Sequence, residues 1–267
     1  MAESVFWAVY LVAGAVAGLL AGLLGVGGGL ILVPVLLALL PYSAIPEAVL
    51  MHTAIGSSLA AIVLTSLASV RAHHARGAVL WSAVWQLLPT LALGALLAGS
   101  VAARFHSRVL TVLFAGFALT MALRIWRSAG AVYVPREPGR WRLPIAGAVI
   151  GLLSGLVGIG GGSLTVPLLL RYGYAMSNAV ATSAACGLPI ALFGSVGYIV
   201  AGWSHDLPRG ASGFVYWPAV LCLTAASCFT APVGARWAHR WSPVRLKRFF
   251  AVFLLLVVAK LLLTLFA

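Results

Sequence analysis

An uncharged apolar run of 35 residues, Phe6–Leu40, constrains this chain more than any other feature. As one straight α-helix it would reach about 52 Å at about 1.5 Å per residue, well beyond the roughly 30 Å of bilayer hydrocarbon. Its glycine triplet, Gly27–Gly29, marks a break, because glycine is a poor helix residue that tolerates positive φ and close backbone approach. Proline disfavours helical backbone at the preceding residue. The sequence therefore predicts an extended Val33 and a short second helix beginning near Pro34.

The same pattern returns 133 positions later. Between Gly18–Leu37 and Gly151–Leu170, 13 of 20 paired positions are identical, including every glycine and the Val-Pro pair. The chain is therefore an internal duplication, and a broken helix at matching places in two halves indicates the binding site of a transporter. Further matches are Met51–Ser58 with Met176–Ser183 and Gly77–Trp81 with Gly213–Trp217.

Other glycines in both halves recur at four-residue spacing. This spacing is typical of small-residue faces at which membrane helices pack closely, and we expect a packing role for them. The two triplets followed by a Val-Pro pair fit a packing face badly, so we expect them to form the site. The packing glycines are Gly14, Gly18, Gly22, Gly147, Gly151 and Gly155.

Composition excludes a soluble globule. The chain is 63% hydrophobic and 8% charged, with a mean hydropathy of +1.09, as expected for a polytopic membrane protein. No basic region precedes the first apolar run, so we expect no cleaved signal peptide. The net charge of +13 lies mostly between apolar segments, where it suits anionic lipid headgroups. The cysteines have no metal-binding spacing, and packing is the role we expect for them.

Apolar runs separated by charged or turn residues predict an all-α membrane protein of about eight transmembrane segments in two homologous halves. Residues 1–123 form the first repeat, 124–142 a basic linker and 143–267 the second repeat, and each repeat has a Gly-rich broken helix. With eight simple crossings the Lys and Arg residues between segments divide eight against eight, so charge does not decide the orientation. Placing the two densest basic clusters together on the cytoplasmic side requires one re-entrant pair in the second half. The segments are Phe6–Leu40, Ala48–Val70, Ala78–Ala103, Val109–Leu123, Leu143–Leu170, Ser177–Trp203, Phe214–Ala235 and Leu246–Ala267.

Each half places two adjacent hydroxyls on its second segment, Ser57/Ser58 and Thr182/Ser183. Such hydroxyls often bond the carbonyl four residues earlier in their own helix, but their recurrence in both halves favours a function. If the short helices point their N-terminal N–H groups at these hydroxyls, the site offers neutral donors, partial positive charge and no carboxylate. That combination predicts an anion site.

We expect the substrate site near the membrane midplane, between the glycine triplets and the hydroxyl pairs. His52 precedes the first pair and is a candidate for binding anion or proton, although its counterpart is Ser177; Asn178, matched to Thr53, is a candidate donor to substrate or a helix cap. No catalytic residue, metal ligand or cofactor is expected. The candidate substrate-binding residues are Gly25, Gly27, Gly28, Gly29, Ser57, Ser58, Gly158, Gly160, Gly161, Gly162, Thr182, Ser183, His52 and Asn178.

The doubled motif Gly-x-x-x-Gly-x-x-Gly-x-Gly-Gly-Gly-x-x-x-Val-Pro, followed by His52–Leu59 and Ala181–Ala184, resembles the TauE/SafE family of membrane permeases over nearly the whole chain. The resemblance implies a multi-pass protein of the bacterial inner membrane that moves sulfite, sulfoacetate or a related sulfur oxyanion. One departure is Gly56-Ser57-Ser58-Leu59, where many first halves of the family read Gly-Thr-Ser-Leu. The hydroxyl is kept, but selectivity by shape can differ.

Two other classes of function are weaker. A membrane-embedded enzyme needs a nucleophile with a base or facing metal ligands, and the sequence has no Gly-x-Ser-x-Gly, no His-Glu-x-x-His and no acidic residue inside a predicted segment. A passive anion channel would use the same residues as a carrier and stays open as the alternative. The expected partners are a small anionic substrate and the lipid bilayer, with a homodimer as a candidate assembly and no nucleic acid.

Overall fold

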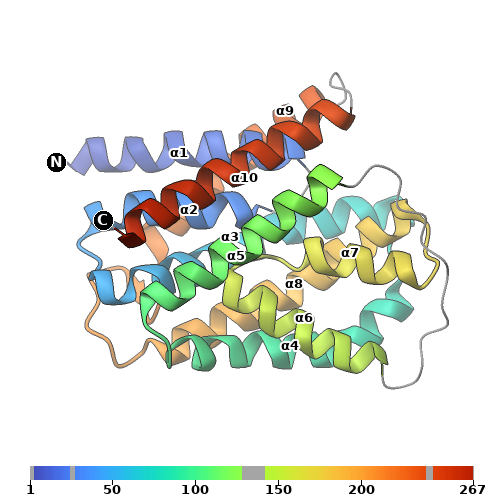
Figure 1. Cartoon of the computed structure of the whole chain (residues 1–267), viewed down its shortest axis with the longest axis horizontal. Helices are drawn as coiled ribbons and strands as arrows, with labels where there is room; N and C mark the ends of the chain where they lie inside the picture. Colours follow the sequence, from blue (N-terminus) through green and yellow to red (C-terminus); the bar gives the residue numbers. More distant parts are fainter. Residues whose placement is uncertain (1–2, 25–27, 128–141, 239–242, 267) are drawn as a thin grey trace.

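The computed structural model describes residues 3–24, 28–127, 142–238 and 243–266. Within these ranges the chain is helical apart from short connections and one small β-hairpin (Figure 1). The elements are α1 (Glu3–Leu24), α2 (Gly29–Leu39), η1 (Leu40–Ser43), η2 (Glu47–Val49), α3 (Leu50–Ala75), α4 (Trp81–Ala102), α5 (Ser107–Arg127), α6 (Arg142–Val157), α7 (Gly162–Arg171), α8 (Met176–Ala201), β1 (Ala211–Ser212), β2 (Val215–Tyr216), α9 (Trp217–Ala238) and α10 (Pro243–Phe266).

Among the described residues, six helices are long and apolar enough to cross a bilayer. They are α3, α4, α5, α8, α9 and α10, and each corresponds to one predicted segment. The all-α polytopic membrane fold that the sequence predicts is therefore present. The other two predicted segments are each divided into two shorter helices, α1 with α2 and α6 with α7.

Both divided segments turn back on themselves. The hydroxyl groups of Tyr10, near the start of α1, and Ser43, just beyond the end of α2, are hydrogen-bonded at 2.7 Å. This contact requires α2 to return along α1 toward the end of the molecule at which α1 begins (Figure 1). Helix α7 likewise runs back toward the end at which α6 begins (Figure 1). The count of eight simple crossings treats each broken segment as one crossing, whereas here each is a hairpin of two helices, and the two hairpins begin at opposite ends of the molecule (Figure 1). We call α1–α2 and α6–α7 the re-entrant hairpins.

The short helices also begin earlier than predicted. Helix α2 starts at Gly29 and α7 at Gly162, so Pro34 and Pro167 lie inside helices and Val33 is helical rather than extended. Val33 has no exposed surface and belongs to the main core. We attribute the difference to this burial, because packing an apolar helix face can outweigh the local preference against helical backbone before proline.

Basic residues are divided unevenly between the two ends of the molecule. We call the end at which α3, α5, α7 and α9 finish the basic end, and it lies on the right in Figure 1. Its described basic residues are Arg71, Arg76, Arg124, Arg127, Arg142, Arg171, Arg236, Arg245, Lys247 and Arg248, whereas Arg104, Arg108, Arg209 and Lys260 lie toward the opposite end. Simple crossings predict an even division of Lys and Arg between the two ends. Because each broken segment instead returns to the end at which it begins, ten of these basic residues lie at the basic end and four toward the other end.

The helices pack through their glycines. Helix α1 lies along α9 and α6 lies along α4. A Cβ atom on Gly14 would lie 2.7 Å from the Leu223 backbone of α9, and one on Gly151 would collide with the Leu91 carbonyl of α4. Only a residue without a side chain permits these approaches. The packing role predicted for Gly22 lies outside what the structure describes. The packing role predicted for the four-residue spacing is confirmed at Gly14, Gly18, Gly147, Gly151 and Gly155.

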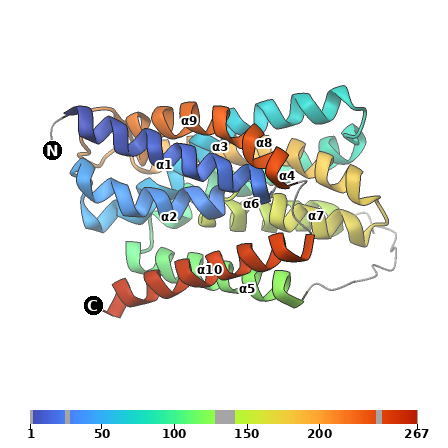
Figure 2. The ribbon, with the colours of Figure 1, turned by 90° about the horizontal axis from the view of Figure 1, so that it is seen from above.

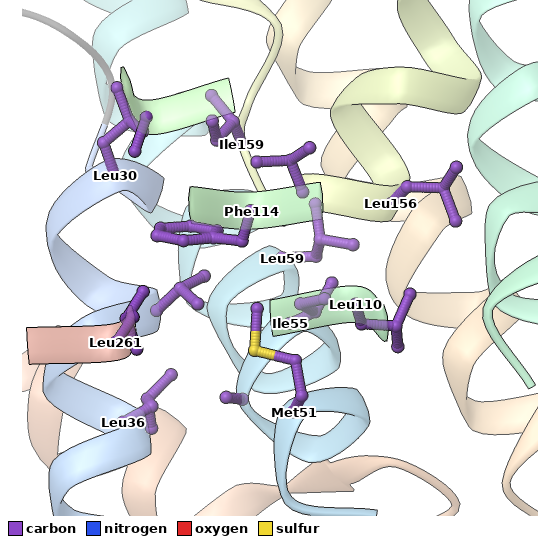
Figure 3. Close-up of a cluster of buried hydrophobic side chains, with 14 of the residues drawn as sticks. Leu30, Leu36, Met51, Ile55, Leu59, Leu110, Phe114, Leu156, Ile159 and Leu261 are labelled. Carbon is purple, nitrogen blue, oxygen red and sulfur yellow. The ribbon is translucent and has the colours of Figure 1, made fainter. Parts of the chain in front are cut away.

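Helix α3 runs through the centre of the core. Every residue from 51 to 62 is buried, including four hydroxyl or imidazole side chains. Figure 3 shows Met51, Ile55 and Leu59 along this helix, with Leu30 of α2 and Ile159 of the α6–α7 connection near one end of the cluster. Helices α5 and α10 pack on each other at the side of the bundle (Figure 2). The core therefore joins both re-entrant hairpins to one buried helix.

Candidate functional site

The two glycine breaks meet inside the protein. A Cβ on Gly29, the first residue of α2, would collide with the Gly158 carbonyl and lie 2.8 Å from the Ile159 Cα. Gly158 and Gly161 both have φ +75°, a conformation that side chains disfavour. All residues from 158 to 161 are buried. These glycines are thus required both for close approach of the two hairpins and for the reversal between α6 and α7.

Two of the four predicted hydroxyls lie at this junction. The Ser58 hydroxyl on α3 donates to the Gly158 carbonyl at 3.0 Å. The Ser183 hydroxyl on α8 donates to the Gly162 carbonyl at 3.4 Å, which is a long and therefore weak hydrogen bond. Neither hydroxyl bonds its own helix, so the common back-bonding of membrane serines does not account for them.

The other two hydroxyls hold the connections of the chain. The Ser57 hydroxyl accepts a hydrogen bond from the Tyr216 N–H at 2.9 Å, and the Thr182 hydroxyl accepts one from the Leu80 N–H at 3.0 Å. Ser57 and Thr182 are fully buried. Each satisfies a backbone donor just before a long helix, α9 or α4, and the structure gives each a partner outside the glycine junction.

His52 and Asn178 lie away from the junction. The His52 Nε2 atom is 3.1 Å from the Ala102 carbonyl oxygen. His52 precedes Ser58 by six residues, which separates the two residues by about 9 Å along α3. The Asn178 side-chain oxygen accepts a hydrogen bond from the Ser177 hydroxyl at 3.2 Å at the start of α8. The structure therefore brings neither residue to the glycine junction.

The remaining candidates are glycines around the same junction. Gly28 is the N-cap of α2. A Cβ on Gly160 would lie 2.9 Å from Ile62 Cγ2, which places this glycine against α3. Gly25 and Gly27 lie outside the described residues.

Two hydroxyls that were not predicted as site residues, Ser163 and Thr165, lie in the first turn of α7. Both side-chain oxygens are buried and have no hydrogen-bond partner among the described residues. The signal was present in the sequence, because Ser163-Leu-Thr165 directly follows the second glycine triplet. A search for features that the two halves share passes over it, since the first half has leucines at the matching positions, Leu30 and Leu32.

The junction offers hydrogen-bond donors without a charged side chain. Gly161 is the N-cap of α7, and its carbonyl accepts from the N–H groups of Leu164 and Thr165. The preceding N–H groups, of Gly162 and Ser163, have no backbone acceptor among the described residues. The nearest basic residue along α7 is Arg171 at its far end. Free N–H groups at the positive end of a helix dipole favour a negatively charged ligand.

The fold is that of an all-α polytopic membrane protein, and comparison with known proteins identifies the protein as a member of a family of membrane transporters. The chain belongs to the family described as Sulfite exporter TauE/SafE, whose profile matches residues 10–261. A probable membrane transporter protein of Haemophilus influenzae is 38% identical over 92% of this chain and 94% of its own length. Relatives with the same description in Methanocaldococcus jannaschii and Bacillus subtilis are 26% and 29% identical, covering 89% and 85% of this chain and 88% and 86% of their own lengths. No solved structure matches the chain.

Proposed function

We propose that the protein is a permease for a small anion, either a sulfur oxyanion such as sulfite or an organosulfonate such as sulfoacetate. The observation that carries this proposal is the first turn of α7, where free backbone N–H groups and buried hydroxyls lie at the junction of two re-entrant hairpins. The family description, which refers to sulfite export, supports a sulfur oxyanion over other anions. Transport without covalent chemistry fits the transporter descriptions of the relatives.

We further propose that residues 1–123 and 143–267 are two repeats related by a pseudo-two-fold axis in the membrane plane, joined by the linker 124–142. In the repeat alignment α1 corresponds to α6 and α4 to α9. The helix contacts follow the same exchange, because α1 packs on α9 and its counterpart α6 packs on α4, the counterpart of α9. The hydrogen bonds from Tyr216 to Ser57 and from Leu80 to Thr182 are exchanged in the same way. Hairpins that enter from opposite ends favour an axis in the plane over one along the membrane normal.

The orientation we propose places the basic end in the cytoplasm. Lys and Arg near membrane-spanning ends accumulate on the cytoplasmic side, and ten of the fourteen described basic residues lie at or near the basic end. The start of α1 and the end of α10 would then face the periplasm of a bacterial inner membrane. The relatives from Haemophilus influenzae and Bacillus subtilis support a bacterial plasma membrane as the location.

The test of function is anion flux into proteoliposomes. Purified protein should take up radiolabelled sulfite or sulfate saturably, and an excess of the transported anion on the opposite side should accelerate the flux. Unitary currents in planar bilayers without saturation would instead identify a passive anion channel. Absence of flux for sulfite, sulfate, thiosulfate, sulfoacetate and taurine would overturn the proposal. A homodimer stays a prediction, to be tested by the mass of the protein in nanodiscs.

A further inference from the structure

The first turns of the two short helices differ in polarity although the glycines before them are the same. Helix α7 begins Gly162-Ser163-Leu164-Thr165, whereas α2 begins Gly29-Leu30-Ile31-Leu32. The leucines Leu30 and Leu32 are buried in apolar clusters. A duplicated pair of half-helices has thus become polar at one member and apolar at the other.

The two hydroxyls of α7 are buried and, among the described residues, unpaired in the first turn of a helix. Thr165 has no exposed surface, and its hydroxyl has no hydrogen-bond partner among the described residues. Several other helical threonines donate to a carbonyl of the preceding turn, as Thr53 does to Val49 at 3.0 Å and Thr111 to Ser107 at 2.9 Å. Among the described residues the buried hydroxyls of Ser154 and Thr224 also lack a partner, but neither lies in the first turn of a helix. Leaving a buried hydroxyl unpaired costs free energy, so a partner that completes its hydrogen bonding is expected.

The geometry directs these hydroxyls to the start of the helix. Side chains of an α-helix tilt toward its N-terminus, and a Cβ built on the N-cap Gly161 would lie 3.5 Å from Thr165 Oγ1. Around Gly162 there is room, since a Cβ built there would have only Ser183 Oγ, at 3.7 Å, within 4 Å among the described residues. The hydroxyls of Thr165 and Ser183 therefore flank the first turn of α7, where the N–H groups of Gly162 and Ser163 are free of backbone acceptors.

We infer that the oxyanion group of the substrate binds at the first turn of α7 alone, and that Ser163 and Thr165 are the side chains that select it. This inference rests on the proposed function and narrows it. A sulfite, sulfate or sulfonate group presents three or four oxygens, each able to accept hydrogen bonds from hydroxyl and backbone donors of the kind gathered here. Chloride has no such directed acceptors. The apolar start of α2 then closes the junction by packing and takes no direct part in binding.

The test compares purified wild-type protein with Thr165→Val, which keeps the shape of the side chain and removes the hydroxyl, and with Ser163→Ala. Thr111→Val is the matched control, because the Thr111 hydroxyl is already bonded within its own helix. Binding of sodium sulfite and sodium sulfate is measured by titration calorimetry in nanodiscs, and uptake of the radiolabelled anions is measured in proteoliposomes. We expect Thr165→Val to weaken binding by about tenfold or more, as for loss of a hydrogen bond to a charged group. Ser163→Ala should have a smaller effect in the same direction.

Thr165→Ser restores a hydroxyl and should recover most of the affinity, which a purely structural role for the methyl group would not allow. Thr111→Val should bind and transport within twofold of wild type. If wild-type protein transports sulfite and Thr165→Val does so with unchanged affinity, the subsite is wrong while the proposed function stands. If wild-type protein neither binds nor transports any of the anions, the proposed function fails and the subsite fails with it.

Discussion

The Ser57 hydroxyl accepts a hydrogen bond from the Tyr216 N–H at 2.9 Å, which joins residues 159 positions apart in the sequence. The equivalent bond, from the Leu80 N–H to Thr182, spans 102 positions. Each hydroxyl thus fixes the connection that leads into a long helix of the other half. The sequence predicts all four hydroxyls of the two pairs in the substrate site. In the structure Ser58 and Ser183 lie at the glycine junction, whereas Ser57 and Thr182 hold connections of the chain.

Removing the acceptor at Ser57 should destabilise the protein more than it impairs transport. Ser57→Ala leaves the buried Tyr216 N–H without a partner, at a cost of about 1–3 kcal/mol, so the apparent melting temperature in detergent should fall. Flux per correctly folded molecule should stay within a few-fold of wild type. Ser183→Ala provides the comparison, because its long bond to Gly162 contributes little to stability, and its main effect should be on flux. The opposite pattern would exchange the roles assigned to the two residues.

The glycine at position 161 should be intolerant of even the smallest side chain. Its φ of +75° disfavours any L-residue by about 1–2 kcal/mol, and a Cβ there would also displace the Cδ1 end of the Ile190 side chain. We therefore expect Gly161→Ala to abolish or strongly reduce transport while the protein still reaches the membrane. Gly116→Ala on α5 is the control, since nothing lies within 4 Å of a Cβ at that position, and helix propensity should make it neutral or slightly stabilising. Normal flux in Gly161→Ala would contradict the role of this turn.

Transport should not depend on the carboxylates Glu47 and Asp206. Both are exposed in connections rather than buried at mid-membrane depth, and proton-coupled carriers commonly hold an ionisable group inside the membrane. We expect the double variant Glu47→Gln/Asp206→Asn to keep anion flux within a few-fold of wild type, with or without a pH gradient. Loss of gradient-driven uptake in this variant would show that one of the two connections takes part in coupling.

Orientation can be measured with a pair of single cysteines in a variant whose native cysteines are replaced by alanine. Ser204 and Arg76 are both exposed, in connections at the end opposite the basic end and at the basic end respectively. With the basic end in the cytoplasm, Ser204→Cys should react with a membrane-impermeant maleimide in intact spheroplasts, and Arg76→Cys only after lysis. Reaction of Arg76→Cys alone in intact spheroplasts would reverse the orientation, and equal reaction of both would contradict the arrangement of crossings.

Much of the secondary structure could be predicted because long apolar runs are strong signals. The segment predicted as Ala78–Ala103 is α4 at Trp81–Ala102, and that predicted as Ser177–Trp203 is α8 at Met176–Ala201. The direction of the chain after each break could not be predicted. A hairpin and a kinked crossing both satisfy the hydropathy of such a run. In the first run the contact between Tyr10 and Ser43 shows that the chain forms a hairpin.

The candidate site was predicted in part. Shared positions led to the glycine junction and to Ser58 and Ser183, because duplication preserves what both halves need. Hydropathy and motif spacing carry no information on which neighbour a buried hydroxyl meets, so the backbone partners of Ser57 and Thr182 were not predicted. Thr165 was not predicted, because the two halves differ at this position: the first half has Leu32 where the second has Thr165.

The contact between Gly29 and Gly158 also has a consequence for biosynthesis. The two glycines are 129 residues apart in the sequence, and at about 5–20 residues per second the ribosome needs about 6 to 26 s to pass from one to the other. During that interval the first hairpin is in the membrane with its break uncovered by the second. We therefore expect the newly made first half to be a substrate for membrane chaperones or proteases until the α6–α7 turn arrives.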